Sequence, residues 1–147
     1  GSGTNSQSDY DHRLRLLADR LGVREQIRFT GYRDDIPRLT QACDAQVITS
    51  ISVEAQSRAV PQAFASMTPV VASRVGGIEE LVKDRYYGRL VGIKDVTAYA
   101  DALIDILDNH EKTRLMVNAA RNFAEQNLLM APKMAETIRI YEKLRHR

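Results

Sequence analysis

Residues 45–82 read AQVITSISVEAQSRAVPQAFASMTPVVASRVGGIEELV, and this stretch decides the fold of the chain. The β-branched runs at residues 45–50 and 69–73 are typical of buried strands, and residues 57–67 between them have a helical pattern. The glycine pair Gly76-Gly77 then indicates a turn before a further short helix. Strands that alternate with helices in this way indicate parallel βαβ units. We therefore predict an α/β fold, a Rossmann-like doubly wound parallel sheet flanked by helices.

The pattern continues on both sides of this stretch. Upstream, residues 9–22 have the apolar spacing of a helix that ends in glycine, and residues 26–30 alternate like a strand. Residues 34–43 begin with acids and a proline, as helices do. Residues 87–91 indicate a fourth, weaker strand, and helical apolar spacing recurs from residue 99 to residue 144. We expect the last third of the chain to be helical.

Composition and charge exclude several functions. The chain has 147 residues, 44% of them hydrophobic, and 21 Lys and Arg against 19 Asp and Glu give a net charge of +2. A balance this near neutral does not indicate nucleic acid or an anionic membrane as a partner. Cys43 is the single cysteine, so an internal disulfide and a cysteine zinc site are excluded. With no apolar span and no signal peptide, we expect a soluble cytoplasmic domain at residues 9–147, after a flexible lead-in or tag remnant at residues 1–8.

The first candidate site follows the run at residues 45–50. Glu54, Ser57 and Arg58 bring a carboxylate, a hydroxyl and a guanidinium to the carboxyl end of a strand, where ligands bind in parallel sheets. Arg58 could contact a phosphate in bidentate fashion. Taken alone, however, the local sequence favours a plainer interpretation, in which Ser57 caps a helix and Glu54 is a solvated loop acid.

The second candidate site is Gly76-Gly77, where N–H groups after a strand suit a phosphate or a sugar hydroxyl. An ordinary strand-to-helix turn is the alternative. No G-x-G-x-x-G fingerprint follows a strand, so NAD binding is poorly supported. The three histidines have no metal-ligand spacing, and no nucleophile elbow is present.

Together the two motifs resemble the C-terminal domain of retaining glycosyltransferases of family four, which have the GT-B fold. The resemblance runs from about residue 14 to residue 107. It is carried by VITS at residues 47–50, Glu54, SR at residues 57–58, QAFA at residues 62–65, PVVAS at residues 69–73, VGG at residues 75–77, and Glu80-Leu81-Val82. RFTG at residues 28–31 and GRLV at residues 88–91 are also similar to strands of the family.

The resemblance implies a site for a nucleotide-diphosphate sugar, with no metal expected. Glu54 takes the place of the family's first glutamate, beside the transferred sugar, and is the implied catalytic residue. The second glutamate, which binds the ribose, falls on Gln62, so this chain departs from the pattern. A neutral amide there weakens a charge-assisted bond by about a factor of two.

The other implied donor-binding residues lie in three segments. Backbone amides around Ser57, Arg58 and Ala59 would meet the diphosphate, Gly76 and Gly77 would lie beside the donor, and the base would pack near Thr30-Gly31-Tyr32. The arginine and lysine that the family uses upstream of this segment have no match in this chain.

The resemblance further implies an enzyme of the hexosyltransferase type that serves polysaccharide biosynthesis, with a glycan or lipid-linked acceptor held by an N-terminal domain. Its membrane contact would be peripheral, at the inner face. The separate domain is expected to transfer no sugar. The alternatives are a non-enzymatic α/β module that binds a nucleotide or a protein, and a receiver domain, against which the missing acidic cluster argues.

Overall fold

The computed structural model describes residues 3–52, 54–55 and 57–145. The chain divides into two compact units, one ending at Asp34 and the other beginning at Asp35. Each unit is described by itself.

Helix α1 (Gly3–Arg20) makes up most of the first unit. It ends where Gly22 adopts a left-handed conformation with φ +67°, and the N–H of Val23 reaches back to the carbonyl oxygen of Ala18 over 3.0 Å. Glycine takes this conformation without a steric penalty, so the predicted stop is confirmed. The helix begins at Gly3, six residues before the predicted start, and reaches into the expected lead-in. The division of the chain at residue 8 stays a prediction.

The predicted strand at residues 26–30 is wrong. A 3₁₀ turn, η1 (Arg24–Gln26), covers its beginning, and no β-ladder follows within the described part of this unit. Ile27 has extended angles, φ −106° and ψ 124°. A strand also needs a neighbouring strand for its N–H and C=O groups, and the alternation of side chains cannot supply one. Phe29 lies instead beneath the guanidinium of Arg15, 4.2 Å from the ring centroid.

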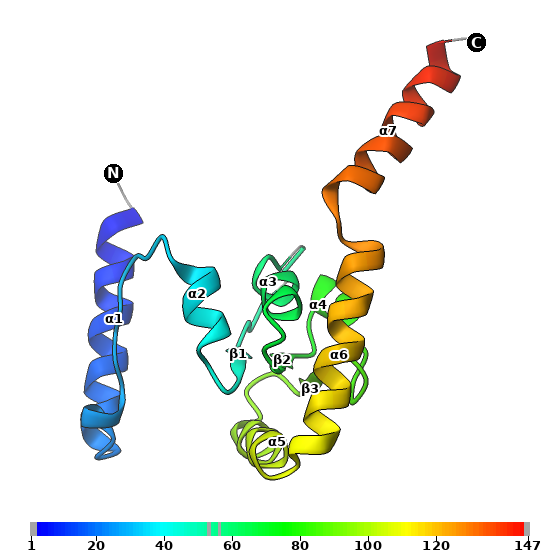
Figure 1. Ribbon diagram of the computed structural model, residues 1–147. Helices are drawn as coiled ribbons and strands as arrows, with labels where there is room; N and C mark the ends of the chain where they lie inside the picture. Colours follow the sequence, from blue (N-terminus) through cyan, green and yellow to red (C-terminus); the bar gives the residue numbers. More distant parts are fainter. Residues whose placement is uncertain (1–2, 53, 56, 146–147) are drawn as a thin grey trace. The chain divides into compact units, whose positions relative to one another are not determined.

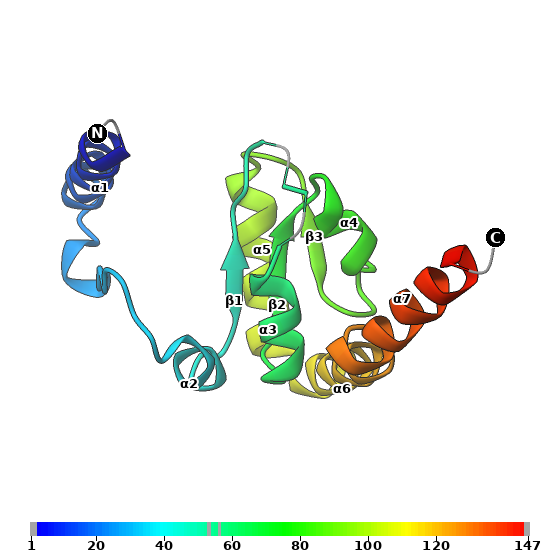
Figure 2. The ribbon, with the colours of Figure 1, turned by 90° about the horizontal axis from the view of Figure 1, so that it is seen from above.

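Three parallel strands form the sheet of the second unit, in the order β1-β2-β3 (Figure 1, Figure 2). They are β1 (Gln46–Ile48), β2 (Val70–Ser73) and β3 (Arg89–Val91). Val47 pairs with Val71, and Ala72 pairs with Leu90. Helix α3 (Ala59–Ala65) follows β1, and helix α4 (Gly77–Leu81) follows β2. The prediction of parallel βαβ units is confirmed.

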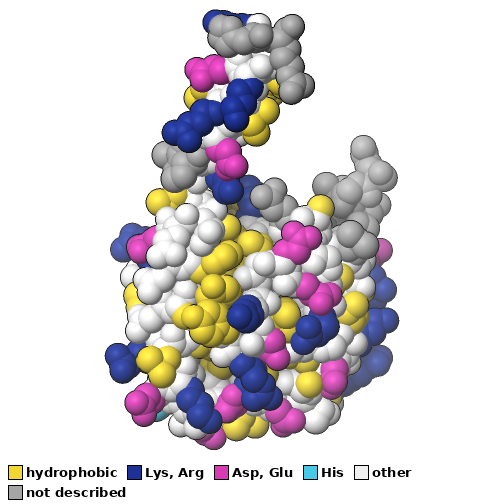
Figure 3. All heavy atoms as spheres, turned by 90° about the vertical axis from the view of Figure 1, so that its right-hand side faces the viewer, with side chains coloured by type: hydrophobic (Ala, Val, Ile, Leu, Met, Phe, Trp, Pro, Cys, Tyr) yellow, Lys and Arg dark blue, Asp and Glu magenta, His cyan; other side chains and the backbone are white. Residues whose placement is uncertain are grey.

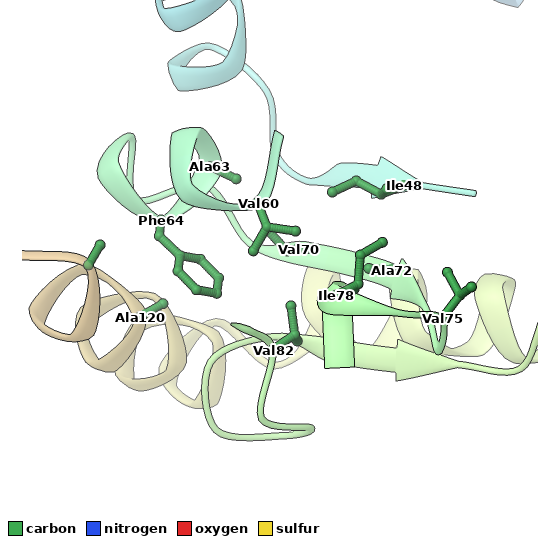
Figure 4. Packing of buried hydrophobic residues seen from close by; sticks show 11 residues of the cluster. Ile48, Val60, Ala63, Phe64, Val70, Ala72, Val75, Ile78, Val82 and Ala120 are labelled. Atoms are coloured by element: carbon green, nitrogen blue, oxygen red, sulfur yellow. The ribbon is translucent and has the colours of Figure 1, made fainter. Parts of the chain in front are cut away.

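The core lies on both faces of the central strand β2, all of whose residues are buried. Successive side chains of a strand point to opposite faces. Val70 and Ala72 accordingly pack on one face against α3, α4 and α6 (His110–Asn127), through Val60, Phe64, Ile78, Val82 and Ala120 (Figure 4). Val71 packs on the other face against Ala102 and Ile106 of α5 (Val96–Asp108). Figure 1 shows α3 and α5 on opposite sides of the strands, as the predicted fold requires.

Helices make up the remainder of the second unit. Helix α2 (Ile36–Gln41) precedes the sheet, and α5, α6 and α7 (Met130–Arg145) follow it, so the last third is helical as predicted. No helix in the described ranges combines the length and the apolar character that a bilayer crossing requires.

Candidate functional site

Two loops at the carboxyl ends of β1 and β2 are in direct contact. The first loop leads from Ile48 to α3 and carries Glu54, and the second leads from Ser73 to α4 and carries the glycine pair. The N–H of Gly77 donates a hydrogen bond to the carbonyl oxygen of Glu54 over 2.9 Å. The two motifs that the sequence presents separately are therefore one structural unit.

The glycine pair is required by this contact. Gly76 has φ +49°, and a Cβ atom built on it would lie 2.6 Å from the carbonyl oxygen of Glu54. A Cβ atom on Gly77 would lie 2.5 Å from the carbonyl oxygen of Ala55. Both distances are shorter than van der Waals contact allows, so neither position has room for a side chain. The N–H of Gly77, expected from the sequence to suit a phosphate or a sugar hydroxyl, is thus engaged by the chain's own Glu54 carbonyl oxygen.

Glu54 is half-buried, and its carboxylate is tethered. The hydroxyl of Ser50, four residues earlier, donates a hydrogen bond to Oε2 of Glu54. An ionised carboxylate accepts several hydrogen bonds, so this bond orients the group and leaves Oε1 available to a ligand. The arrangement suits a fixed negative charge beside a reaction centre.

Ser57 is buried in the same loop, with 1% of its surface exposed. Its hydroxyl oxygen has no hydrogen-bond partner among the residues that the structure describes. The residue lines a pocket of about 400 Å³, together with Ala55, Pro61, Gly77, Glu80, Leu81 and Leu128. We call this the Ser57 pocket. Buried hydroxyl groups are normally paired, so an orphaned one beside a pocket marks a place for a ligand or a water molecule.

Arg58 and Ala59 mark the start of α3. Arg58 precedes the helix and is exposed, and Ala59 is its first residue and is half-buried. Gln62, also on α3, is exposed and lines a different pocket, of about 290 Å³, which includes Arg121 and Glu125 of α6. The structure therefore brings Glu54, Ser57 and the glycine pair together, whereas Gln62 lines an adjoining pocket that shares Pro61 and Leu128 with the Ser57 pocket.

Thr30, Gly31 and Tyr32 lie in the first unit, which ends at Asp34. All three are exposed, Tyr32 almost completely at 97%. Gly31 has a left-handed φ of +62°. Their predicted role in packing against a base stays a prediction.

Glu80 is a residue of the Ser57 pocket that the sequence did not single out as a site residue. Helix α4 carries two adjacent acids, and Glu79 pairs with Arg74 over 3.7 Å. Glu80 lines the pocket and forms no ion pair or hydrogen bond within the described ranges. The available signal was an acid three residues after the glycine pair. In the family resemblance this acid belongs to the motif without an assigned role.

Hydrogen bonds from Tyr99 of α5, which we call the brace, support the strand ends at which the two loops begin. The hydroxyl of Tyr99, on α5, donates to the carbonyl oxygen of Ile48 over 2.8 Å and lies 2.8 Å from the hydroxyl of Ser73. Ile48 and Ser73 are the last residues of β1 and β2. The brace therefore holds the point from which both site loops depart.

Charges of both signs are interspersed on the face seen in Figure 3, with hydrophobic side chains gathered over its middle. This pattern agrees with the net charge of +2. Within the part of the chain that the structure describes, no group of three or more His, Cys, Asp or Glu side chains is placed to hold a metal ion.

Comparison with known proteins identifies the family of this chain. The profile of the family described as "Glycosyl transferases group 1" matches residues 2–123. The chain is 36% identical over 127 residues to D-inositol 3-phosphate glycosyltransferase of Corynebacterium aurimucosum, covering 85% of this chain and 29% of that protein. It is also 36% identical over 103 residues to the lipopolysaccharide core biosynthesis glycosyltransferase LpsE of Rhizobium meliloti, covering 69% of this chain and 30% of that protein.

Solved structures agree with these relatives. The chain superposes on the crystal structure of Anabaena Alr3699/HepE in complex with UDP with a TM-score of 0.85 and 30% identity, over 90% of this chain and 37% of that one. The structure of HepE in complex with UDP-glucose matches with a TM-score of 0.84. The chain thus spans between 29% and 37% of the length of these relatives. The family match over most of its residues shows that the chain belongs to the group 1 glycosyl transferases, with the α/β architecture of their GT-B fold.

Proposed function

We propose that this chain is the donor-binding domain of a retaining glycosyltransferase of the hexosyltransferase type. It binds a nucleotide-diphosphate sugar, and the sugar passes to a glycan or lipid-linked acceptor held by an N-terminal domain of the same enzyme. Because the active site needs both domains, the 147-residue chain binds the donor but transfers no sugar alone.

The observation that carries this proposal is the contact between the Glu54 loop and the glycine pair. It places a tethered carboxylate, a buried unpartnered hydroxyl and a pocket at the carboxyl end of a parallel sheet. Ligands bind at this end of such sheets. HepE, which is 30% identical to this chain, was crystallised in complex with UDP and with UDP-glucose.

Each group of the site has a chemical task in this proposal. A retaining transfer passes through a sugar with oxocarbenium character while negative charge grows on the departing diphosphate. The Glu54 carboxylate, oriented by Ser50, stabilises the positive sugar. Arg58, exposed just before α3, supplies a positive charge to the diphosphate, which lowers the barrier.

Binding is tested by titrating the isotope-labelled chain with UDP, UDP-glucose, GDP and GDP-mannose and following its amide resonances. We expect shifts at residues 54–62 and 76–80, and none along α5 at residues 101–108, which serve as an internal control. If none of the four nucleotides moves the two site segments, donor binding by this chain is refuted.

Gln62 supports a second candidate function. The family resemblance implies an acid at this position, and here a neutral, exposed side chain lines the adjoining pocket. The chain would then be a non-enzymatic module that binds a nucleotide. Release of nucleoside diphosphate by the longer polypeptide, when it is supplied with the bound nucleotide sugar and candidate acceptors, favours the enzyme. Binding without release favours the module.

A further inference from the structure

The two acids of helix α4 differ in their surroundings. Glu79 is paired with Arg74, whose Nη1 lies 3.7 Å from the Glu79 carboxylate. Glu80 lines the Ser57 pocket, and among the described residues its carboxylate has neither an ion pair nor a hydrogen bond. Both acids are exposed; Glu79 is paired with a neighbouring arginine, whereas Glu80 lies at the wall of the Ser57 pocket.

The chemistry of the Ser57 pocket favours a neutral part of a ligand that carries hydroxyl groups. Its polar groups are the Glu80 carboxylate, which only accepts hydrogen bonds, and the Ser57 hydroxyl, which donates or accepts. Pro61, Leu81 and Leu128 supply apolar wall. A carboxylate repels a phosphate but binds a hydroxyl through a charge-assisted hydrogen bond, and an apolar wall suits the C–H face of a sugar ring.

Gln62 stands where the family resemblance implies a second glutamate, so the acids near the site need to be compared. The family's second acid would accept hydrogen bonds from the donor, but Gln62 is neutral and exposed, and it lines a pocket together with Arg121 and Glu125. The carboxylate in the pocket that contains Ser57 and Gly77 comes from α4, as Glu80.

We propose that Glu80 is a donor-binding residue whose carboxylate accepts hydrogen bonds from hydroxyl groups of the nucleotide sugar. This inference rests on the proposed function. The hydroxyl groups belong either to the ribose or to the transferred sugar, and the two sources share the same chemistry.

Calorimetric titration of Glu80→Gln and Glu79→Gln with UDP, UDP-glucose, GDP and GDP-mannose tests this role. The two variants remove the same charge from neighbouring positions, so loss of charge alone would strengthen the binding of an anionic ligand in both. We expect Glu80→Gln to weaken binding about tenfold, equivalent to about 1.4 kcal/mol, and Glu79→Gln to leave it unchanged or slightly stronger.

The ligands separate the two sources of hydroxyl groups. A loss in Glu80→Gln that is equal for a nucleoside diphosphate and its sugar assigns Glu80 to the ribose, and a loss confined to the nucleotide sugar assigns it to the transferred sugar. Equal affinities of the two variants, with the parent chain still binding, overturn the role of Glu80 and leave the proposed function standing. Failure of the parent chain to bind any of the four overturns both. Glu80→Asp, which keeps the charge, provides a second variant with an expected intermediate affinity.

Discussion

The N–H of Gly77 donates a hydrogen bond to the carbonyl oxygen of Glu54 over 2.9 Å, across 23 positions of sequence. The bond joins the loop after β1 to the first residue of α4. It explains why a glycine pair accompanies an acidic loop in this chain, because the two backbones approach too closely for a side chain to lie between them.

A methyl group at Gly77 should disrupt this contact. We expect Gly77→Ala to lower the free energy of unfolding by about 1–3 kcal/mol, since its Cβ would lie 2.5 Å from the carbonyl oxygen of Ala55. The Glu54 loop would move and nucleotide affinity would fall. Gly92→Ala is the control, because its Cβ would meet Asp95 at an ordinary 3.6 Å. Urea denaturation of both variants tests the prediction, which equal midpoints would contradict.

Glu54→Gln should remove most of the turnover of the longer enzyme, by about 10²-fold, because the neutral amide no longer stabilises positive charge on the sugar. Ser50→Ala keeps the carboxylate and removes only its orienting bond, so we expect a smaller loss, of about tenfold. Initial rates at saturating donor, with circular dichroism to verify the fold, provide the comparison. Full activity in Glu54→Gln would remove this residue from the mechanism.

Ser57→Ala should affect stability and binding in opposite directions. The buried hydroxyl has no partner in the described structure, so removing it leaves the free energy of unfolding unchanged or raises it by about 1 kcal/mol, while nucleotide affinity falls. Thr68→Val is a matched contrast, because the Thr68 hydroxyl donates to the carbonyl oxygen of Thr40 over 2.8 Å and its loss costs about 1 kcal/mol. Thermal denaturation of both variants, with and without UDP-glucose, measures their stability and the stabilisation that the nucleotide sugar provides. A Ser57→Ala variant as destabilised as Thr68→Val would show that Ser57 has a structural role.

Gln62→Glu should be tolerated. The side chain is exposed, so we expect the free energy of unfolding to change by less than about 0.5 kcal/mol. Because Gln62 lines the pocket with Arg121 and Glu125, the nucleotide affinity of Gln62→Glu should stay within about twofold of that of the parent chain. Calorimetric titration of Gln62→Glu with the nucleotide measures this affinity, and Gln62→Ala serves as the comparison variant. Clearly tighter binding by the acidic variant would contradict this prediction and support the ribose role that the family resemblance implies.

Much of the fold could be predicted because buried segments have a recognisable pattern of apolar and β-branched residues. The run at residues 69–73 is apolar and β-branched, and it becomes β2, buried on both faces. Residues 26–30 show why such prediction has a limit. Their alternation is a property of the segment, whereas a β-ladder is a property of two segments, and the first unit has no partner strand among its described residues.

The position of the site loops could also be predicted from the sequence, but the direction of individual side chains could not. Parallel topology brings every loop that follows a strand to the same edge, so the meeting of Glu54 with Gly76-Gly77 follows from the order of the elements. The direction in which a helical side chain points does not follow from that order. Glu79 and Glu80 are neighbours of the same type, yet one pairs with Arg74 and the other lines the Ser57 pocket.

By itself, the sequence of this chain determined the α/β class, the parallel strands and the two loops that carry the site, because periodicity and glycine position are local consequences of burial and backbone geometry. The tertiary structure alone decided which residues share a pocket. Ser57, Gly77 and Glu80 become neighbours through the packing of α3, α4 and the end of α6 on one face of the sheet, and Gln62 is turned into a different pocket by the same packing. Contacts between segments distant in sequence depend on how faces pack, which no single segment encodes.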